Sequence, residues 1–269
     1  MTTATVERTH VGGKPKSDYT TQRASKLLRP ERIENSASHL EQLQRISNDL
    51  ETATPQEIVR WAMETYGEKL TMATAFGAEG CSLIAMIAQI RDETGITPDI
   101  FNLDTGYQFA ETLELRERIQ EKYGIPIRLV SASETIEQME QRHGGPLYST
   151  DADHCCRLRK VVPLENAVQG FGAWMTAIRR DQTRQRAGAP IVGPEHKFAH
   201  LVKINPLANW SKTQVWDYVG ANEVPVNPLH AQGYPSIGCL PCTRPVAAGD
   251  DDRAGRWVGT IKKECGIHT

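Results

Sequence analysis

Four of the six cysteines of this chain fall into two pairs whose spacing could hold a metal or a cluster. Cys155 and Cys156 are adjacent, whereas two residues separate Cys239 from Cys242. Four thiolates are the usual ligands of a [4Fe–4S] cluster and also of structural zinc. Zinc normally takes chelating pairs with a spacer, while adjacent side chains diverge and can reach different irons. The spacing favours a cluster over zinc, with unrelated thiols as a third reading and a vicinal disulfide disfavoured by strain.

The other two cysteines lie in very different surroundings. Cys265 is four residues from the end of the chain, where Lys262, Lys263 and His268 would favour its thiolate, the reactive form. The following glycine and the terminal position predict a mobile segment, and the plain alternative is a stray surface thiol. Cys81 lies in an apolar helical stretch and is predicted to pack in the core.

Basic residues gather in segments that flank the cysteines, although the formal net charge is only -2. Guanidinium groups suit phosphate and sulfate oxygens, although charge runs are often only solvated loops. Lys160 follows Cys156 by four residues, on the same face if a helix begins there, and could stabilise anionic thiolates or an anionic substrate. The near-neutral total gives no reason to expect nucleic-acid binding. The arginines of these segments are Arg179, Arg180, Arg184, Arg186, Arg253 and Arg256.

The elements that must position these residues alternate between strands and helices. Buried apolar runs predict strands over residues 70–76, 99–103, 126–130 and 174–178. Helical spacing predicts helices within residues 33–67, 81–90, 109–123, 157–168 and 211–219. The alternation predicts an α/β fold, a parallel twisted sheet with helices on both faces. Ligands then bind at the carboxyl ends of the strands, where residues 77–80, 104–106 and 179 onward fall. The turn over residues 77–80 could offer N–H groups to an anion, but it lacks the Walker ending.

The 269 residues divide into three predicted parts. Residues 1–32 are rich in Thr, Ser, Lys and Arg and are predicted to be a disordered tail, with a targeting peptide as the alternative. Residues 33–258 form the main domain, and residues 259–269 form a mobile catalytic tail. The apolar stretches are too short to cross a bilayer and no secretion signal is evident, so we expect a cytoplasmic protein without membrane contact.

Together these stretches resemble the assimilatory adenylyl-sulfate reductases of the PAPS/APS reductase family. The resemblance covers the chain from about Leu70 to its end, in the order of the family. Its paired cysteines and its terminal Glu-Cys-Gly-Ile-His make it specific. The matching stretches are Ala75–Glu79, Leu103–Gly106, Cys155–Lys160, Arg179–Gln182, Ile237–Pro245, Arg253–Trp257 and Glu264–His268.

The resemblance implies an adenine nucleotide α-hydrolase-like fold and a two-step reaction. The Cys265 thiolate would attack the sulfur of adenosine 5'-phosphosulfate, AMP would leave, and thioredoxin or glutaredoxin would release sulfite from a cysteine S-sulfonate. His268 would assist in the tail, and Lys160 would supply positive charge. The implied cluster ligands are Cys155, Cys156, Cys239 and Cys242. The implied substrate-binding residues are Phe76, Gly77, Ala78, Glu79, Leu103, Asp104, Thr105, Gly106, Arg179, Arg186, Arg253 and Arg256.

Several positions depart from the family pattern. Tyr107 stands where an arginine is common, Gly80 where an acidic residue is frequent, and Ile267 and Thr269 are milder changes. No thioredoxin-like domain follows the reductase segment, so we expect the reductant to be a separate protein. The sequence leaves a homo-oligomer open.

Three other functions compete with this interpretation. A reductase of the 3'-phosphorylated substrate resembles this chain but typically lacks the four cluster cysteines. An ATP-dependent tRNA-thiolating enzyme would need a Ser-Gly-Gly-x-Asp-Ser loop, which residues 75–81 do not provide. In a non-catalytic iron–sulfur sensor, Cys265 would be incidental.

Overall fold

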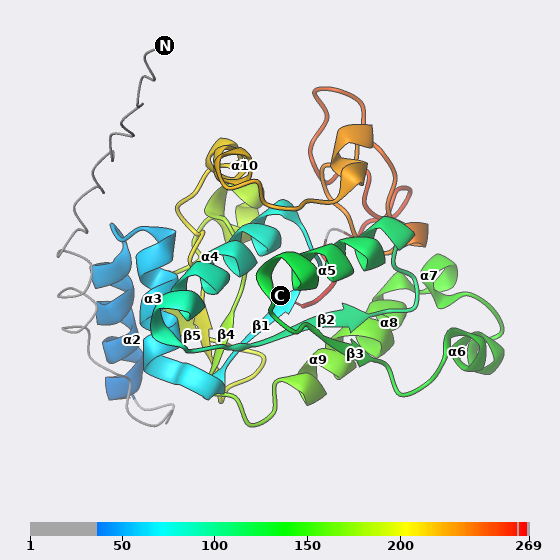
Figure 1. The fold of residues 1–269 in the computed structure, drawn as a ribbon. Coiled ribbons are helices and arrows are strands. Elements are labelled where there is room, and N and C mark those ends of the chain that lie inside the picture. Colours follow the sequence, from blue (N-terminus) through cyan, green and yellow to red (C-terminus); the bar gives the residue numbers. More distant parts are fainter. Residues whose placement is uncertain (1–36, 263, 268–269) are drawn as a thin grey trace, which may run out of the picture.

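The computed structural model describes residues 37–262 and 264–267, and within them a six-stranded sheet forms the centre of the fold (Figure 1). The strand order is β3-β2-β1-β4-β6-β5, and all pairs are parallel except β5 with β6. The predicted parallel α/β sheet is confirmed, with one antiparallel edge strand added. The strands are β1 (Leu70–Thr74), β2 (Asp99–Asp104), β3 (Arg128–Ser131), β4 (Ala173–Met175), β5 (Val192–Pro194) and β6 (Val202–Ile204).

Helices cover both faces of this sheet, as the sequence predicts. The longer helices are α2 (Ala37–Leu50), α3 (Pro55–Tyr66), α4 (Ala78–Thr94), α5 (Ala110–Tyr123), α6 (Ile136–His143) and α10 (Lys212–Ala221). The shorter ones are α7 (Leu147–Thr150), α8 (Ala152–Cys156) and α9 (Val162–Ala167). Short 3₁₀ turns span Gly67–Lys69, Arg180–Gln182, Arg184–Arg186, Pro228–Gln232 and Leu240–Cys242. No helix in this described part of the chain is long and apolar enough to cross a bilayer.

Alternate residues of the central strands enter two separate apolar clusters, because successive side chains of a strand point to opposite faces. Ile100 of β2 packs with α2, α3, α4, α5 and α10 on one face. Its neighbour Phe101 packs on the other face with Leu164 of α9, Trp174 and Phe198. Cys81, predicted as a core residue, is fully buried in the first cluster.

Local sequence signals account for several helix boundaries. Ser211 caps α10, because its side chain accepts a hydrogen bond from Gln214 N while the Gln214 side chain accepts one from Ser211 N. The predicted helix over residues 157–168 instead begins at Ala152 and widens into a π-helical stretch, Arg157–Val161. Pro163 lacks the N–H that a regular helix would donate to the carbonyl of residue 159, which is a physical reason for the irregularity.

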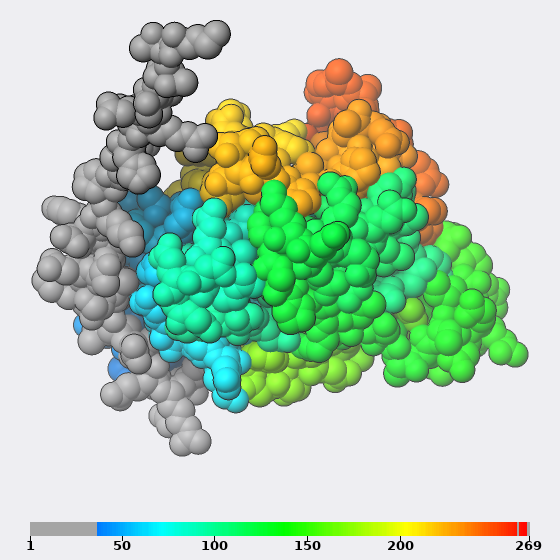
Figure 2. Space-filling view, in the orientation of Figure 1, coloured from blue at the N-terminus to red at the C-terminus, as the bar shows by residue number. Residues whose placement is uncertain are grey.

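The C-terminal part of the chain runs back over the carboxyl ends of the strands. Figure 2 shows its orange segments rising above the end of α5. The described part of the tail reaches the central cavity, since Cys265 and Ile267 line it. The predicted disordered tail over residues 1–32 lies outside the described residues.

Candidate active site

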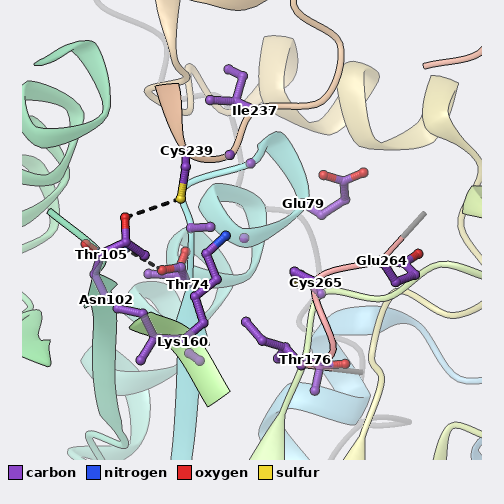
Figure 3. Close-up of a pocket in the computed structure, with 18 of the residues that line it drawn as sticks. Thr74, Glu79, Asn102, Thr105, Lys160, Thr176, Ile237, Cys239, Glu264 and Cys265 are labelled. Carbon is purple, nitrogen blue, oxygen red and sulfur yellow. Dashed lines mark hydrogen bonds between the residues drawn. The ribbon is translucent and has the colours of Figure 1, made fainter. Parts of the chain in front are cut away.

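The carboxyl ends of β1, β2 and β4 open into one cavity of about 230 Å³, which is where ligands bind in open α/β sheets (Figure 3). Its walls come from segments that are distant in the sequence: the strand ends, the π-helical stretch, residues 237–239 and the tail. Four of the predicted cations line it together with the predicted nucleophile. These residues are Lys160, Arg186, Arg253, Arg256 and Cys265.

The turn between β1 and α4 forms one edge of the cavity. Gly77 and Glu79 line the cavity, whereas the side chains of Phe76 and Ala78 are buried in the core. A Cβ atom on Gly80 would lie 2.8 Å from the Thr74 hydroxyl oxygen. A larger side chain at this position would therefore have to displace the Thr74 side chain.

The end of β2 connects the cavity to the cysteines. Leu103 and Thr105 line the cavity, while Asp104 turns away and accepts a hydrogen bond from Gly106 N (2.9 Å). The Thr105 hydroxyl lies 3.3 Å from the sulfur of Cys239, and Figure 3 shows this contact. This contact joins the wall of the cavity to a predicted cluster ligand.

The predicted arginines divide into two groups by their contacts. Arg186 and Arg253 line the cavity and both bind the carboxylate of Glu264, each at 3.1 Å. Arg179 is buried and pairs with Glu79 and with Asp181, the latter at 2.8 Å. Arg179 therefore lies behind the cavity wall, where it holds Glu79 in place.

Lys160 lies between the cavity and the cysteines. It lines this cavity and also a much smaller one, of about 10 Å³, that is lined by all four paired cysteines. Burial alone would lower the pKa of Lys160, but nearby Cys239 and Cys265 raise it above its ordinary value. Lys160 thus carries a positive charge between two sets of sulfur atoms.

The paired cysteines cannot all ionise without compensating charge. Burial, reinforced by the neighbouring thiols, raises the pKa of Cys155 to about 12. Burial raises the pKa of Cys156 to about 11 although Lys160 opposes it. For Cys239, burial raises the pKa, but Lys160 and the Thr105 hydroxyl outweigh burial and lower it.

The four paired cysteines line one small cavity, as ligands of a single four-thiolate group would. As the described side chains stand, no three or more His, Cys, Asp or Glu are arranged to hold a single metal ion.

A pair of backbone segments ties the cysteine loop to two of the arginines. Thr243 and Arg256 form an antiparallel bridge, and Trp257 N donates to Cys242 O (3.1 Å). A Cβ atom on Gly238 would lie 2.1 Å from a terminal nitrogen of Arg256. The ring of Trp257 packs under the same guanidinium, 4.4 Å from it. The position of Arg256 therefore depends on the loop that carries Cys239.

The described tail is held on both sides of Cys265. Before it, Glu264 pairs with the two arginines named above; after it, Lys197 donates to the carbonyl of Gly266. Ile267 packs against the second apolar cluster. His268, predicted to assist catalysis, lies outside the described residues, as do Lys263 and Thr269.

Sequence reasoning missed several residues of the cavity. Glu264 precedes the predicted nucleophile in the tail, and that position is the signal that could have indicated it. Others lie at strand ends or in loops whose side-chain direction only the fold decides; Ile237 and Trp257 lie in stretches that match the family, and the rest carry no separate signal. These other residues are Thr74, Asn102, Gln108, Thr176, Ile237 and Trp257.

Comparison with known proteins identifies the family of this chain. Residues 69–245 match the phosphoadenosine phosphosulfate reductase domain. The chain belongs to this family.

Among its relatives, the adenosine 5'-phosphosulfate reductase of Halalkalibacterium halodurans is 42% identical over 224 residues, covering 83% of this chain and 95% of that protein. Adenosine 5'-phosphosulfate reductase 1 of Bacillus subtilis is 43% identical over 212 residues, covering 78% and 89%. The family resemblance inferred from the motifs is confirmed.

Solved structures support the fold. The phosphoadenylyl-sulfate reductase of Candida auris, in a phosphate complex, superposes with a TM-score of 0.68 and 30% identity, covering 80% of this chain and all of that one. The FMN adenylyltransferase of Candida glabrata reaches 0.51 at 13% identity, with coverage of 84% and 71%. The second likeness concerns the fold alone.

Proposed function

We propose that this chain reduces adenosine 5'-phosphosulfate to sulfite and AMP in sulfate assimilation. The observation that carries the proposal is the position of Cys265, which lines a cavity together with Lys160, Arg186, Arg253 and Arg256. The sulfuryl group of the substrate is surrounded by negatively charged oxygens, which repel an attacking thiolate. Cations held at the cavity lower that barrier, because they act where charge develops. The names of the bacterial relatives support the same substrate.

The reaction then proceeds through covalent catalysis by the tail cysteine. The Cys265 thiolate forms a bond to the substrate sulfur, the bond from that sulfur to the phosphate oxygen breaks, and AMP leaves with the electron pair. The product on the chain is a cysteine S-sulfonate. A thiolate of thioredoxin or glutaredoxin attacks Sγ of Cys265 and expels sulfite. The second thiol of the reductant resolves the mixed disulfide, so two thiols supply the two electrons.

The four paired cysteines would hold a [4Fe–4S] cluster. When bound, the cluster would act electrostatically next to the substrate. Lys160 would keep its charge between that group and the reacting sulfur, and Thr105 would hold the sulfur of Cys239 through its hydroxyl. The small cavity that all four cysteines line supports this ligand set.

The second step requires the tail to leave the cavity, because a protein reductant must reach Cys265. In the described structure the tail is held by ion pairs, a hydrogen bond and the packing of one apolar side chain. Water can replace the polar partners, and the apolar side chain can become exposed to solvent. The proposed reductant is a separate protein and the proposed location is the cytoplasm. A homo-oligomer is compatible with this scheme.

One solved relative is named a phosphoadenylyl-sulfate reductase, so the 3'-phosphorylated substrate is the second candidate. The deciding experiment is anaerobic sulfite formation from each compound with thioredoxin and dithiothreitol. We expect sulfite from the unphosphorylated compound alone. A preference for the phosphorylated one would overturn the substrate assignment. No sulfite from either, with iron content intact, would overturn the reductase and favour a sensor.

A further inference from the structure

Cys265 is flanked by contacts of Glu264 and of Gly266, and substrate binding in the proposed reaction would weaken only those of Glu264. On one side, Glu264 binds Arg186 and Arg253. Those arginines line the cavity and are the cations that the proposed substrate needs, so a bound phosphosulfate competes with Glu264 for them. The Glu264 contacts therefore weaken when the nucleophile must be held most accurately.

The contacts on the other side involve no cation of the cavity. Lys197 Nζ donates to the carbonyl oxygen of Gly266, the residue after the nucleophile, and does not line the cavity of the described residues. Gly266 has a φ of +77°, a conformation that costs glycine little. Ile267 then packs against the apolar cluster that contains Trp174 and Phe198.

The loop that carries Lys197 is fixed by its own contacts. It connects β5 to β6, and the backbone N–H of Lys197 donates to the side chain of Glu195 (3.0 Å). Glu195 also pairs with Lys203 of β6 at 2.8 Å. Leu201 N donates to Phe198 O at 2.8 Å, which closes the turn. These contacts hold the turn that carries Lys197, and so they restrict the position of its side chain.

We propose that the β5–β6 loop is the dock of the catalytic tail and that Lys197 is a positioning residue for Cys265. This inference rests on the proposed function. While the substrate engages Arg186 and Arg253, the bond from Lys197 to Gly266 and the packing of Ile267 keep the thiolate at the cavity. Release of the dock then frees the S-sulfonate for the reductant.

The test compares Lys197→Met with a matched control, Lys122→Met. Met keeps the apolar stem and removes the ammonium. Lys122 is suitable because its ammonium also donates to a backbone carbonyl, that of Glu223, and does not line the cavity. Lys197→Arg keeps a charged donor and should restore most of the effect. Thermal unfolding checks that each variant is folded.

Two rates measure how well the β5–β6 loop holds the tail, one without substrate and one with it. The first is alkylation of Cys265 by iodoacetamide without substrate, read by mass spectrometry of the tail peptide. The second is formation of the S-sulfonate in a single anaerobic turnover. In Lys197→Met we expect alkylation to rise and S-sulfonation to fall, each roughly fivefold, the size of one hydrogen bond. The KM should change by less than about twofold. Lys197 does not line the cavity, so its loss should not remove binding energy that the ground state and the transition state share.

Each outcome decides the inference. Alkylation and S-sulfonation rates equal to those of Lys122→Met would overturn it. A raised KM with an unchanged single-turnover rate would mean that Lys197 binds substrate instead, which also overturns it. If the unsubstituted protein makes no sulfite, the proposed function fails, while the alkylation rates still decide whether Lys197 docks the tail.

Discussion

The cysteines of the smaller cavity and Cys265 are all thiols of one region, but the chain holds them by different means. Cys155 and Cys156 end helix α8, and Cys239 and Cys242 bound a 3₁₀ turn whose backbone is bonded to residues 255–257. Cys265 belongs to no regular element and is held through side chains of Arg186, Arg253 and Lys197. The cysteines that would bind a cofactor are fixed by backbone hydrogen bonds of their elements. The cysteine that would react is held by side-chain contacts that can break.

The largest effect should come from the tail thiol. In Cys265→Ser, sulfite formation should fall by about 10³-fold or more, because a neutral hydroxyl replaces the nucleophilic thiolate. Iron content and absorbance should stay unchanged, since the cavity wall is intact. Mass spectrometry should find no S-sulfonate after incubation with adenosine 5'-phosphosulfate. A normal yield of sulfite would remove the distinction between the two regions.

The next largest effect concerns the four paired cysteines. In Cys239→Ser, iron and acid-labile sulfide should fall to a small fraction of the unsubstituted level, because one of the four proposed thiolate ligands is lost. Cys81→Ala is the matched control, since Cys81 is buried in the core near Phe76 O and distant from the shared cavity. It should cost about 1 kcal/mol of stability and keep its iron. Iron loss in both variants would point to a general folding defect.

A smaller effect should arise where the two regions meet. In Gly238→Ala, the added methyl group overlaps Arg256 and must displace that guanidinium. We expect kcat/KM to fall about tenfold, the cost of a misplaced cation that stabilises the transition state. In the control Gly220→Ala, nothing lies within 4 Å of the added atom and kcat/KM should not change. Steady-state kinetics on both variants distinguish a local displacement from a general effect of methyl addition.

The smallest effect should follow from loosening the tail on its arginine side. In Glu264→Gln, the ion pairs with Arg186 and Arg253 weaken and both arginines become free for the substrate. We expect the KM to fall about threefold and alkylation of Cys265 to rise by a similar factor. Glu93→Gln, which removes an exposed partner of Arg60, is the control. A raised KM would show that Glu264 supports substrate binding.

Sequence patterns predicted the features that depend on local composition. Strands β1 to β4 and the α4, α5 and α10 helices appear within a few residues of their expected positions. Strands β5 and β6 were missed because neither lies in a longer apolar run, as the equally short β4 does, and β5 contains glycine and proline, which are depleted in strands. Side-chain direction was equally inaccessible, as Arg179 shows: its position in a basic run could not reveal that it pairs with Glu79.

Spacing and residue type predicted that the cysteines and the arginine segments contribute to one site. In the structure, the cysteines other than Cys81 and three of the arginines line two adjoining cavities. The contacts of the tail were not predictable, because they join residues far apart in the chain. Glu264 and Arg186, or Lys197 and Gly266, meet only once the sheet has formed.

The backbone pairing between residues 239–244 and 253–257 has a thermodynamic consequence. An anion that restrains Arg253 and Arg256 also restrains the loop of Cys239, and a group bound to that loop restrains the arginines. Such coupling is reciprocal, so each ligand strengthens the binding of the other by the same factor. Nucleotide would thus slow the loss of iron to a chelator. A chain that had lost its iron would bind nucleotide correspondingly less tightly.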